Sequence, residues 1–361
     1  MPDGVLKDLL ANGVIGGVGG VIVFLPNILI LFFFISFMED SGYMARAAFI
    51  MDRMMHRIGL HGKSFIPLVM GFGCNVPAVI AARTIESKSS KAITVLITPF
   101  MSCSARLPVF VLLIGTFFSS HAALVFLSMY ALGVLVAVFT AKLLRKVFFK
   151  RDETPFVMEL PPYRVPTFKT SLRHMWAKGK QYLNKMGGII LLSSVIVWAL
   201  NFFPLRDESA KDVQAENIAE SNEIDPERDS YLEMIGKAVN PALAPLGFSW
   251  RATVAAVAGL PAKEIVVSTL GVLYTGDEEA TDQTLSARLT QPLVGADKPD
   301  FDTATALSFM IFILLYCPCF ATIVAIVKET RSWRYGWFSI LYNTAVAWVL
   351  AFVAYRLALL F

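Results

Sequence analysis

Residues 303–327 read TATALSFMIFILLYCPCFATIVAIV, a run without Asp, Glu, Lys or Arg that a Cys-Pro-Cys triplet interrupts. A helix needs about 20 such residues to cross roughly 30 Å of hydrocarbon. Four other runs of at least 20 residues lack these charges, at 9–38, 107–141, 186–205 and 336–355. The chain has 361 residues, 56% of them hydrophobic, and a mean hydropathy of +0.60. We therefore predict an all-α polytopic membrane protein.

Charge is distributed unevenly between two of the polar segments. Residues 142–185 carry eleven Lys and Arg against three acids, whereas residues 206–233 carry ten acids against three bases. The positive-inside rule places the first segment in the cytoplasm and the acidic loop outside. Within the first segment, 166–185 has the pattern of a basic amphipathic helix that meets lipid headgroups. Nothing in this pattern indicates nucleic-acid binding.

The apolar segments predict about eight transmembrane helices, with an interfacial helix at 43–58 after the first. The expected spans are 19–38, 64–82, 92–118, 122–141, 187–204, 250–275, 303–327 and 336–356. Residues 1–147 then form a first repeat, 148–186 a cytoplasmic linker, and 187–361 a second repeat that contains the acidic loop.

The two halves share an order of features. Residues 59–77 overlay 247–265 at an offset of 188, and 92–104 overlay 306–318 at an offset of 214, which matches Cys103 with Cys317. Each half has a long span, an interrupted segment, a segment with a central Cys and Pro, and a closing span. Paired Gly- or Pro-interrupted segments at corresponding positions are the best sequence indication of a transporter's binding site.

Simple alternation of eight spans conflicts with the charges in the second half. It places 328–334, with net charge +2, outside and 276–302, with net charge −5, inside. A re-entrant segment or an extra crossing would remove the conflict, and the sequence does not choose between them.

All four cysteines lie in apolar segments beside Gly or Pro: Cys74, Cys103, Cys317 and Cys319. A single free Cys is commonly a small buried hydrophobe. Four such positions favour a metal pathway, because thiolates prefer ferrous iron, zinc or copper to Na⁺, K⁺ or Mg²⁺. The spacing of the triplet is not that of a CxxC zinc pair, and a permeating ion must also be released.

Charged residues in or beside the breaks are functional candidates, because charge inside a membrane is costly. Lys263 and Glu264 have an alternative role in neutralising each other at the break. Glu39 and Asp40 form either a solvated helix end or a carboxylate entrance that concentrates a cation. The broken segments supply the candidates for the pathway and its gating, which are Gly71, Gly73, Asn75, Pro77, Ser102, Arg106, Lys263, Glu264 and Pro318.

No catalytic motif is present: the sequence contains no GxSxG, HExxH or Walker A pattern. We therefore expect a transport protein and not an enzyme, without a nucleotide site.

Several stretches resemble the membrane domain of the ferrous-iron transport protein B (FeoB) family. They are LILFFFISFMEDSGYMARAAFIMDR, GKSFIPLVMGFGCNVPAVIAARTIES, PFMSCSARLPVF, ELPPYRVPTF and GLPAKEIVVSTLGVLY, in the order of the family. The resemblance implies two Gate-type repeats and Fe²⁺ uptake across the bacterial inner membrane. It implies that Cys74, Cys103 and Cys317 line the ion path and that Glu39 lies at its mouth. Cys319 is a weaker candidate for the path.

The same resemblance implies partners. The family has a cytosolic GTPase domain, which this sequence lacks, so nucleotide hydrolysis is assigned to no residue here. Nucleotide state would bias the gate through the basic helix at 166–185. Small cytosolic accessory proteins and a second copy of the chain are further candidate partners.

Two alternatives stay open. One is a Gate-type carrier of another solute, either a nucleoside or another divalent metal, although the cysteines argue against a nucleoside. The other is a regulatory membrane subunit that does not transport.

Overall fold

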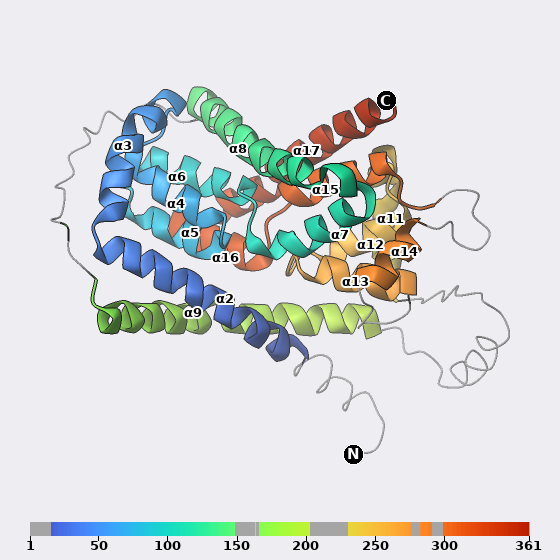
Figure 1. Cartoon of the computed structure of the whole chain (residues 1–361), viewed down its shortest axis with the longest axis horizontal. Coiled ribbons are helices and arrows are strands. Elements are labelled where there is room, and N and C mark those ends of the chain that lie inside the picture. Colours follow the sequence, from blue (N-terminus) through green and yellow to red (C-terminus); the bar gives the residue numbers. More distant parts are fainter. Residues whose placement is uncertain are drawn as a thin grey trace, which may run out of the picture.

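The computed structural model describes residues 16–148, 163, 166–202, 230–275, 282–290 and 299–360, and the regular structure in these ranges is all helical (Figure 1). The first half contains α2 (Gly16–Asp40), α3 (Tyr43–Ile58), α4 (Phe65–Gly71), α5 (Asn75–Ala81), α6 (Lys88–Ile97), α7 (Leu107–Phe117) and α8 (Ala122–Val147). The second half contains α9 (Phe168–Phe202), α11 (Tyr231–Leu243), α12 (Trp250–Ala258), α13 (Ile265–Thr275), α14 (Asp282–Thr290), α15 (Thr303–Leu315), α16 (Phe320–Thr330) and α17 (Trp333–Ala358). Most of the acidic loop and most of the linker at 148–165 lie outside the described residues.

The two halves have a similar order of elements, apart from α14, which occurs in the second half. A long helix (α2 or α9) and a second helix (α3 or α11) are followed by two short helices (α4–α5 or α12–α13). A broken long segment (α6–α7 or α15–α16) and a continuous helix (α8 or α17) complete each half. Contacts between the halves follow the same plan, since α5 contacts α16 and their counterparts α13 and α7 also touch.

One end of the molecule gathers basic side chains of the first half around an acid of the second, and we call it the basic end. Arg145, in the last turn of α8, donates to the Gly59 carbonyl at 2.6 Å and to two serines at the start of α6. Glu329, near the end of α16, accepts from Arg83 and Lys91 of the first half. The ends of α5, α8 and α16 therefore lie together with the start of α6. The positive-inside rule assigns this end to the cytoplasm.

Two further contacts join the ends of α8 and α2 to the starts of α17 and α9 at the basic end. The rings of Phe148, after α8, and Phe338, in the first turns of α17, have centroids 5.7 Å apart. Asp40, at the end of α2, lies 3.3 Å from His174 near the start of α9. The segment at 328–334 thus shares an end with the basic segment 142–146, so simple alternation of eight spans was wrong there.

Corresponding helices of the two halves run in opposite directions. α2 and α8 end at the basic end, whereas their counterparts α9 and α17 begin there; α6–α7 begins there, whereas α15–α16 ends there. The halves therefore form an inverted repeat, which is a common plan of secondary transporters.

The two interrupted segments are re-entrant hairpins that begin and end on one side. Lys63, just before α4, donates to Glu86, just after α5, at 2.6 Å. This ammonium holds the pKa of the exposed Glu86 carboxyl below its usual value. In the second half, the hydroxyls of Ser249 at the start of α12 and Tyr274 at the end of α13 lie 3.5 Å apart. The first hairpin opens at the basic end and the second at the opposite end, as inverted halves require.

Because each hairpin begins and ends on one side, neither crosses the membrane as the spans expected at 64–82 and 250–275 would. Among the described residues, four stretches are long and apolar enough to cross: Lys88–Phe117, Ser119–Val147, Thr303–Thr330 and Trp333–Ala358. The helices α2 and α3 meet at 80°, and they make a fifth candidate stretch if this bent pair is counted as one span. Gly42 between them has φ 75°, a left-handed conformation that glycine adopts easily. α3 confirms the helix predicted at 43–58, and its interfacial location stays a prediction.

The basic helix predicted at 166–185 and the span predicted at 187–204 form one continuous helix. α9 has 35 residues, which correspond to about 52 Å at 1.5 Å per residue. It packs antiparallel along α2 (Figure 1), and a Cβ at Gly179 would lie 2.6 Å from Leu29. The helix is thus longer than the hydrocarbon is thick, and its basic N-terminal half extends to the basic end.

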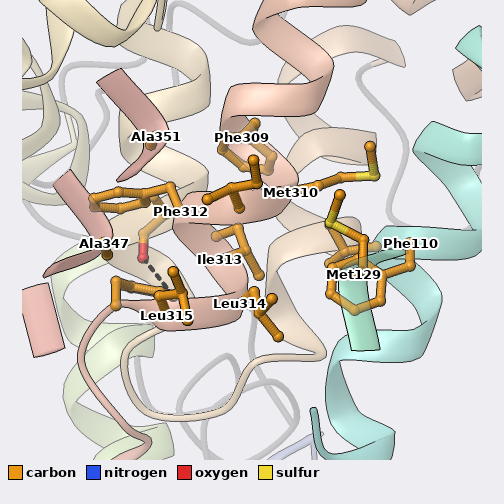
Figure 2. Close-up of a cluster of buried hydrophobic side chains, with 14 of the residues drawn as sticks. Phe110, Met129, Phe309, Met310, Phe312, Ile313, Leu314, Leu315, Ala347 and Ala351 are labelled. Atoms are coloured by element: carbon orange, nitrogen blue, oxygen red, sulfur yellow. Dashed lines mark hydrogen bonds between the residues drawn. The ribbon is translucent and has the colours of Figure 1, made fainter. Parts of the chain in front are cut away.

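The broken segments occupy the centre, and the continuous helices cover them. Most of α15 is buried, between Ala347 and Ala351 of α17 on one side and Phe110 and Met129 on the other (Figure 2). Small residues allow such close helix packing in membranes. α8 and α17 instead expose large apolar side chains, as lipid-facing helices do: Leu124, Leu127, Leu135, Phe139, Trp337 and Leu341.

Candidate functional site

In the first half, the tip of the hairpin lies against the break of the neighbouring span. Residues 72–74 between α4 and α5 are not helical, and residues 101–103 interrupt the path from α6 to α7. The backbone N–H and hydroxyl of Ser104 donate to the Gly73 carbonyl at 3.2 and 2.9 Å. Carbonyls freed by a break survive at membrane depth only where protein or a cavity satisfies them. The two breaks therefore form one unit.

The second half repeats this arrangement with a charged contact. Lys263, at the tip of the α12–α13 hairpin, donates from Nζ to the Cys317 carbonyl in the α15–α16 break at 2.7 Å. The same nitrogen lies 3.1 Å from the centroid of the Tyr316 ring. The Tyr316 hydroxyl in turn donates to the carbonyl of Ala256 in α12 at 3.1 Å.

These two pairs of breaks meet at the centre of the molecule, and we call the assembly the break cluster (residues 71–74, 101–106, 259–264 and 316–319). Cys74 lies within electrostatic range of Cys103 in its own half and Cys319 in the other. Lys263 interacts in the same way with Arg106. Cys74 and Cys319 also border one apolar cluster formed by α5 and α16. The structure thus brings together residues that are far apart in the sequence.

The predicted thiols share this region without forming a closed metal cage. All four are free, with Cys103 and Cys317 buried and Cys74 and Cys319 partly exposed. The Cys319 sulfur lies 3.1 Å from the Thr322 hydroxyl. Among the described residues, no group of three or more His, Cys, Asp or Glu side chains is placed to hold a metal ion. Such an open set of soft donors suits transient binding better than a permanent site.

Two buried cations act on backbone carbonyls at the breaks. Arg106, 1% exposed, donates to the carbonyls of Met101 and Pro99 at 2.9 and 3.0 Å. Lys263, 2% exposed, binds the Cys317 carbonyl. In the described residues no carboxylate lies within ion-pair distance of Lys263, although Glu264 lies within electrostatic range of it, so their mutual neutralisation stays an alternative. Glu264 is half-buried and lies within electrostatic range of Cys74.

Asn75, Pro77 and the two glycines shape the first hairpin. With its amide nitrogen facing carbonyls, Asn75 donates to Thr98 and to Gly71 at 3.2 Å each. Pro77 is the third residue of α5, where a helical N–H has no partner to lose. A Cβ at Gly71 would lie 2.9 Å from Met101, and one at Gly73 would lie 2.6 Å from Leu31. The glycines therefore permit the close approach that the hairpin needs.

The remaining candidates in the breaks lie where the sequence placed them. Ser102 is buried in the α6–α7 break, beside Tyr130 of α8. Pro318 lies between Cys317 and Cys319 at the non-helical turn before α16.

Glu39 and Asp40 do not line the break cluster. Glu39 accepts from Lys178 of α9 at 2.6 Å, and Asp40 accepts from Ser171 at 3.3 Å and lies 3.3 Å from His174. Both lie at the basic, cytoplasmic end, because the first hairpin returns to the side from which it entered. The ion pairs with α9 favour the solvated helix end over the carboxylate entrance, which stays a prediction.

Sequence reasoning missed Tyr316 and Ser104. Tyr316 precedes the Cys-Pro-Cys triplet and holds the Lys263 nitrogen over its ring. Ser104 follows Cys103 and binds the opposite hairpin tip. Their proximity to the breaks was the available signal, but an aromatic ring and a hydroxyl in an apolar segment have many ordinary uses.

Family models match most of the chain. A model described as "Nucleoside recognition" (Gate) matches residues 21–117 and 183–333, and one described as "Ferrous iron transport protein B C terminus" (FeoB_C) matches 126–178. The chain belongs to the Gate family, as the membrane part of FeoB. Together the two models cover both hairpins and all four thiols of the break cluster.

FeoB relatives align along nearly the whole chain. The "Fe(2+) transport protein A/Fe(2+) transporter FeoB fusion protein" of Porphyromonas gingivalis is 53% identical over 383 residues, which cover 100% of this chain and 45% of the relative. The "Fe(2+) transporter FeoB" of Staphylococcus aureus is 43% identical, covering 99% and 50%, and that of Methanocaldococcus jannaschii is 42% identical, covering 96% and 49%. The chain thus spans about half the length of these relatives. No solved structure matches it.

Proposed function

We propose that this chain forms the path by which Fe²⁺ crosses the bacterial inner membrane into the cytoplasm. The observation that carries the proposal is the convergence of four backbone breaks and four free cysteines between two inverted halves. Half-helices that meet near the middle of inverted repeats are the usual form of a transporter's binding site. Relatives that align with the whole chain are named Fe(2+) transporters, which supplies the cargo.

The donors in the break cluster suit ferrous iron. Thiolate sulfur and carbonyl oxygen together bind a borderline divalent metal better than an alkali ion. We assign Cys74, Cys103 and Cys317 as pathway ligands, with Cys319 as a further donor. The four thiols do not form a complete set of ligands around one point. This favours brief binding of the ion by two or three donors at a time, so that it can leave.

The inverted hairpins provide a route for gating. The first opens toward the basic end and the second toward the opposite end, so movement of each would open the cluster to a different side. Gly71, Gly73, Asn75 and Pro77 would permit movement in the first hairpin. In the second hairpin, Lys263 and Glu264 would contact the turn at Pro318 in the α15–α16 break. Ser102 and Arg106 would stabilise the α6–α7 break. Fe²⁺ would then pass Glu39 and Asp40 only on the exit side.

The basic half of α9 is the proposed point of regulation. It is tied to the end of α2 through the ion pairs of Glu39 and Asp40 and lies at the cytoplasmic end. A GTPase domain of the FeoB system would reach the gate there, and small accessory proteins or a second copy of the chain would act from the same side. The chain itself is proposed to carry no enzymatic activity and no nucleotide site.

The Gate description keeps nucleoside transport as a second candidate. Uptake of both solutes discriminates between them. The chain, joined to the remaining half of a FeoB relative, is expressed in cells that lack their own Fe²⁺ uptake. Simultaneous Cys74→Ser, Cys103→Ser and Cys317→Ser should abolish anaerobic uptake of radiolabelled Fe²⁺.

The control is Ser128→Ala, since Ser128 is exposed on α8 and its hydroxyl binds only its own helix, so uptake should not change. Survival of Fe²⁺ uptake in the triple variant at equal membrane abundance would refute the thiol path. Nucleoside uptake that survives where Fe²⁺ is not transported would favour the second candidate.

A further inference from the structure

Lys263 is a buried cation whose direct contacts are neutral groups, while Arg106 and Glu264 lie farther away within electrostatic range. Its side chain is 2% exposed, and its Nζ contacts the Cys317 carbonyl at 2.7 Å and the Tyr316 ring at 3.1 Å from the centroid. In the part of the chain that the structure describes, no carboxylate lies within ion-pair distance of its ammonium. A carbonyl oxygen and the face of an aromatic ring are both groups that attract cations. The ammonium therefore occupies a place that a free cation would seek.

The first half shows that the packing itself needs no charge. At the offset of 188 that relates the hairpins, the counterpart of Lys263 is Asn75. The Asn75 amide donates to the carbonyls of Thr98 and Gly71 at 3.2 Å each, so it too holds a hairpin tip against a neighbouring segment. A neutral amide thus performs in one half what an ammonium performs in the other. The positive charge of Lys263, which is costly to bury, needs a separate explanation.

We propose that Lys263 is a tethered competitor of the transported cation. Its ammonium occupies the Cys317 carbonyl and the Tyr316 ring face when no metal is bound, and Fe²⁺ must displace it to bind at the α15–α16 break. This inference rests on the proposed function. A competing charge keeps the breaks joined when the path is empty, and it weakens metal binding enough for the ion to be released.

Metal binding to neutral and charged variants tests the proposal. Fe²⁺ affinity is measured anaerobically on the purified chain, as wild type, Lys263→Gln and Lys263→Arg. Gln removes the charge and keeps an amide donor, as Asn75 does, and should tighten the Kd for Fe²⁺ at least tenfold. Arg keeps the charge and should bind no more tightly than wild type. The control is Lys63→Gln at the base of the first hairpin, which removes a charge outside the break cluster and should leave the Kd within twofold.

A second measurement uses the wild-type chain and does not depend on the folding of a variant. A small amine-reactive label is applied with and without Fe²⁺, and modification of Lys263 is compared with that of Lys63 by mass spectrometry. Displacement by Fe²⁺ should raise the relative labelling of Lys263 several-fold.

The outcomes separate this inference from the proposed function. Unchanged or weaker Fe²⁺ binding by a folded Lys263→Gln, or unchanged labelling with Fe²⁺ bound, overturns the competitor role alone. Absence of Fe²⁺ binding by the wild type overturns the proposed function and the inference with it.

Discussion

Replacing Glu329 with Gln is expected to loosen the two halves at the cytoplasmic end. Glu329 lies in the last turn of α16 and accepts from Arg83, just after α5, and from Lys91 in α6. These contacts join residues that are 246 and 238 positions apart, so they connect the halves directly. α5 and α16 are also the helices that border Cys74 and Cys319. A weaker contact here should therefore ease opening of the break cluster toward the cytoplasm.

The size of the effect follows from the burial of the ion pairs. The Glu329 side chain is 13% exposed, that of Lys91 is 24% exposed and that of Arg83 is 45% exposed. Fully exposed pairs contribute about 0–1 kcal/mol, and breaking a buried pair costs about 3–5 kcal/mol. This intermediate site should lose about 1–2 kcal/mol, which corresponds to a roughly 5- to 30-fold shift in the opening equilibrium.

Amide hydrogen exchange measures this opening locally. In Glu329→Gln, protection should fall about 5- to 30-fold in the last turns of α5 and α16, while the centre of α8 keeps its protection. The matched control is Glu86→Gln, whose carboxylate is 70% exposed and binds Lys63 within the first hairpin. It should leave exchange in α16 unchanged. Equal effects of the two variants, or none in α5 and α16, would refute the reasoning.

Three further variants test other contacts. A Cβ at Gly133 would lie 2.7 Å from the Phe100 carbonyl oxygen, so Gly133→Ala should lower the free energy of unfolding by about 1–3 kcal/mol. The control is Gly115→Ala, which should leave that free energy unchanged because a Cβ there would have no neighbour within 4 Å. Thermal unfolding in detergent compares the two variants. Ser104→Ala removes the hydrogen bond from the hydroxyl to the Gly73 carbonyl but keeps the one from the backbone N–H. It should lower the free energy of unfolding by about 0.5–1.5 kcal/mol in the same assay, and a loss above about 3 kcal/mol would contradict this geometry. Glu39→Gln breaks a pair whose side chains are 62% and 36% exposed, so stability should change by less than about 1 kcal/mol. The Fe²⁺ Kd should also stay the same in that variant, and a tenfold weaker Kd would place Glu39 among the ligands.

The membrane class, the duplication and the positions of the breaks could be predicted from the sequence because they depend on local features. Charge-free runs identify spans, and Gly or Pro within them marks the interruptions at 71–77, 259–264 and 316–319. The amphipathic pattern at 43–58 likewise predicted α3 with the bounds that the structure has.

From the sequence, re-entrance was only one of two alternatives, because a hairpin of two short helices has the length and composition of a broken span. The distinction depends on tertiary contacts between its ends, such as Lys63 with Glu86 and Ser249 with Tyr274. The convergence of thiols from both halves likewise depends on packing between segments more than 200 positions apart.

The most direct test of the account is to locate iron in the molecule. An anomalous-scattering map is collected at the iron absorption edge from crystals soaked anaerobically with Fe²⁺. The account predicts a peak inside the break cluster, within bonding distance of at least one sulfur of Cys74, Cys103, Cys317 or Cys319. Iron found only at Glu39 and Asp40, or no iron between the two halves, would contradict it.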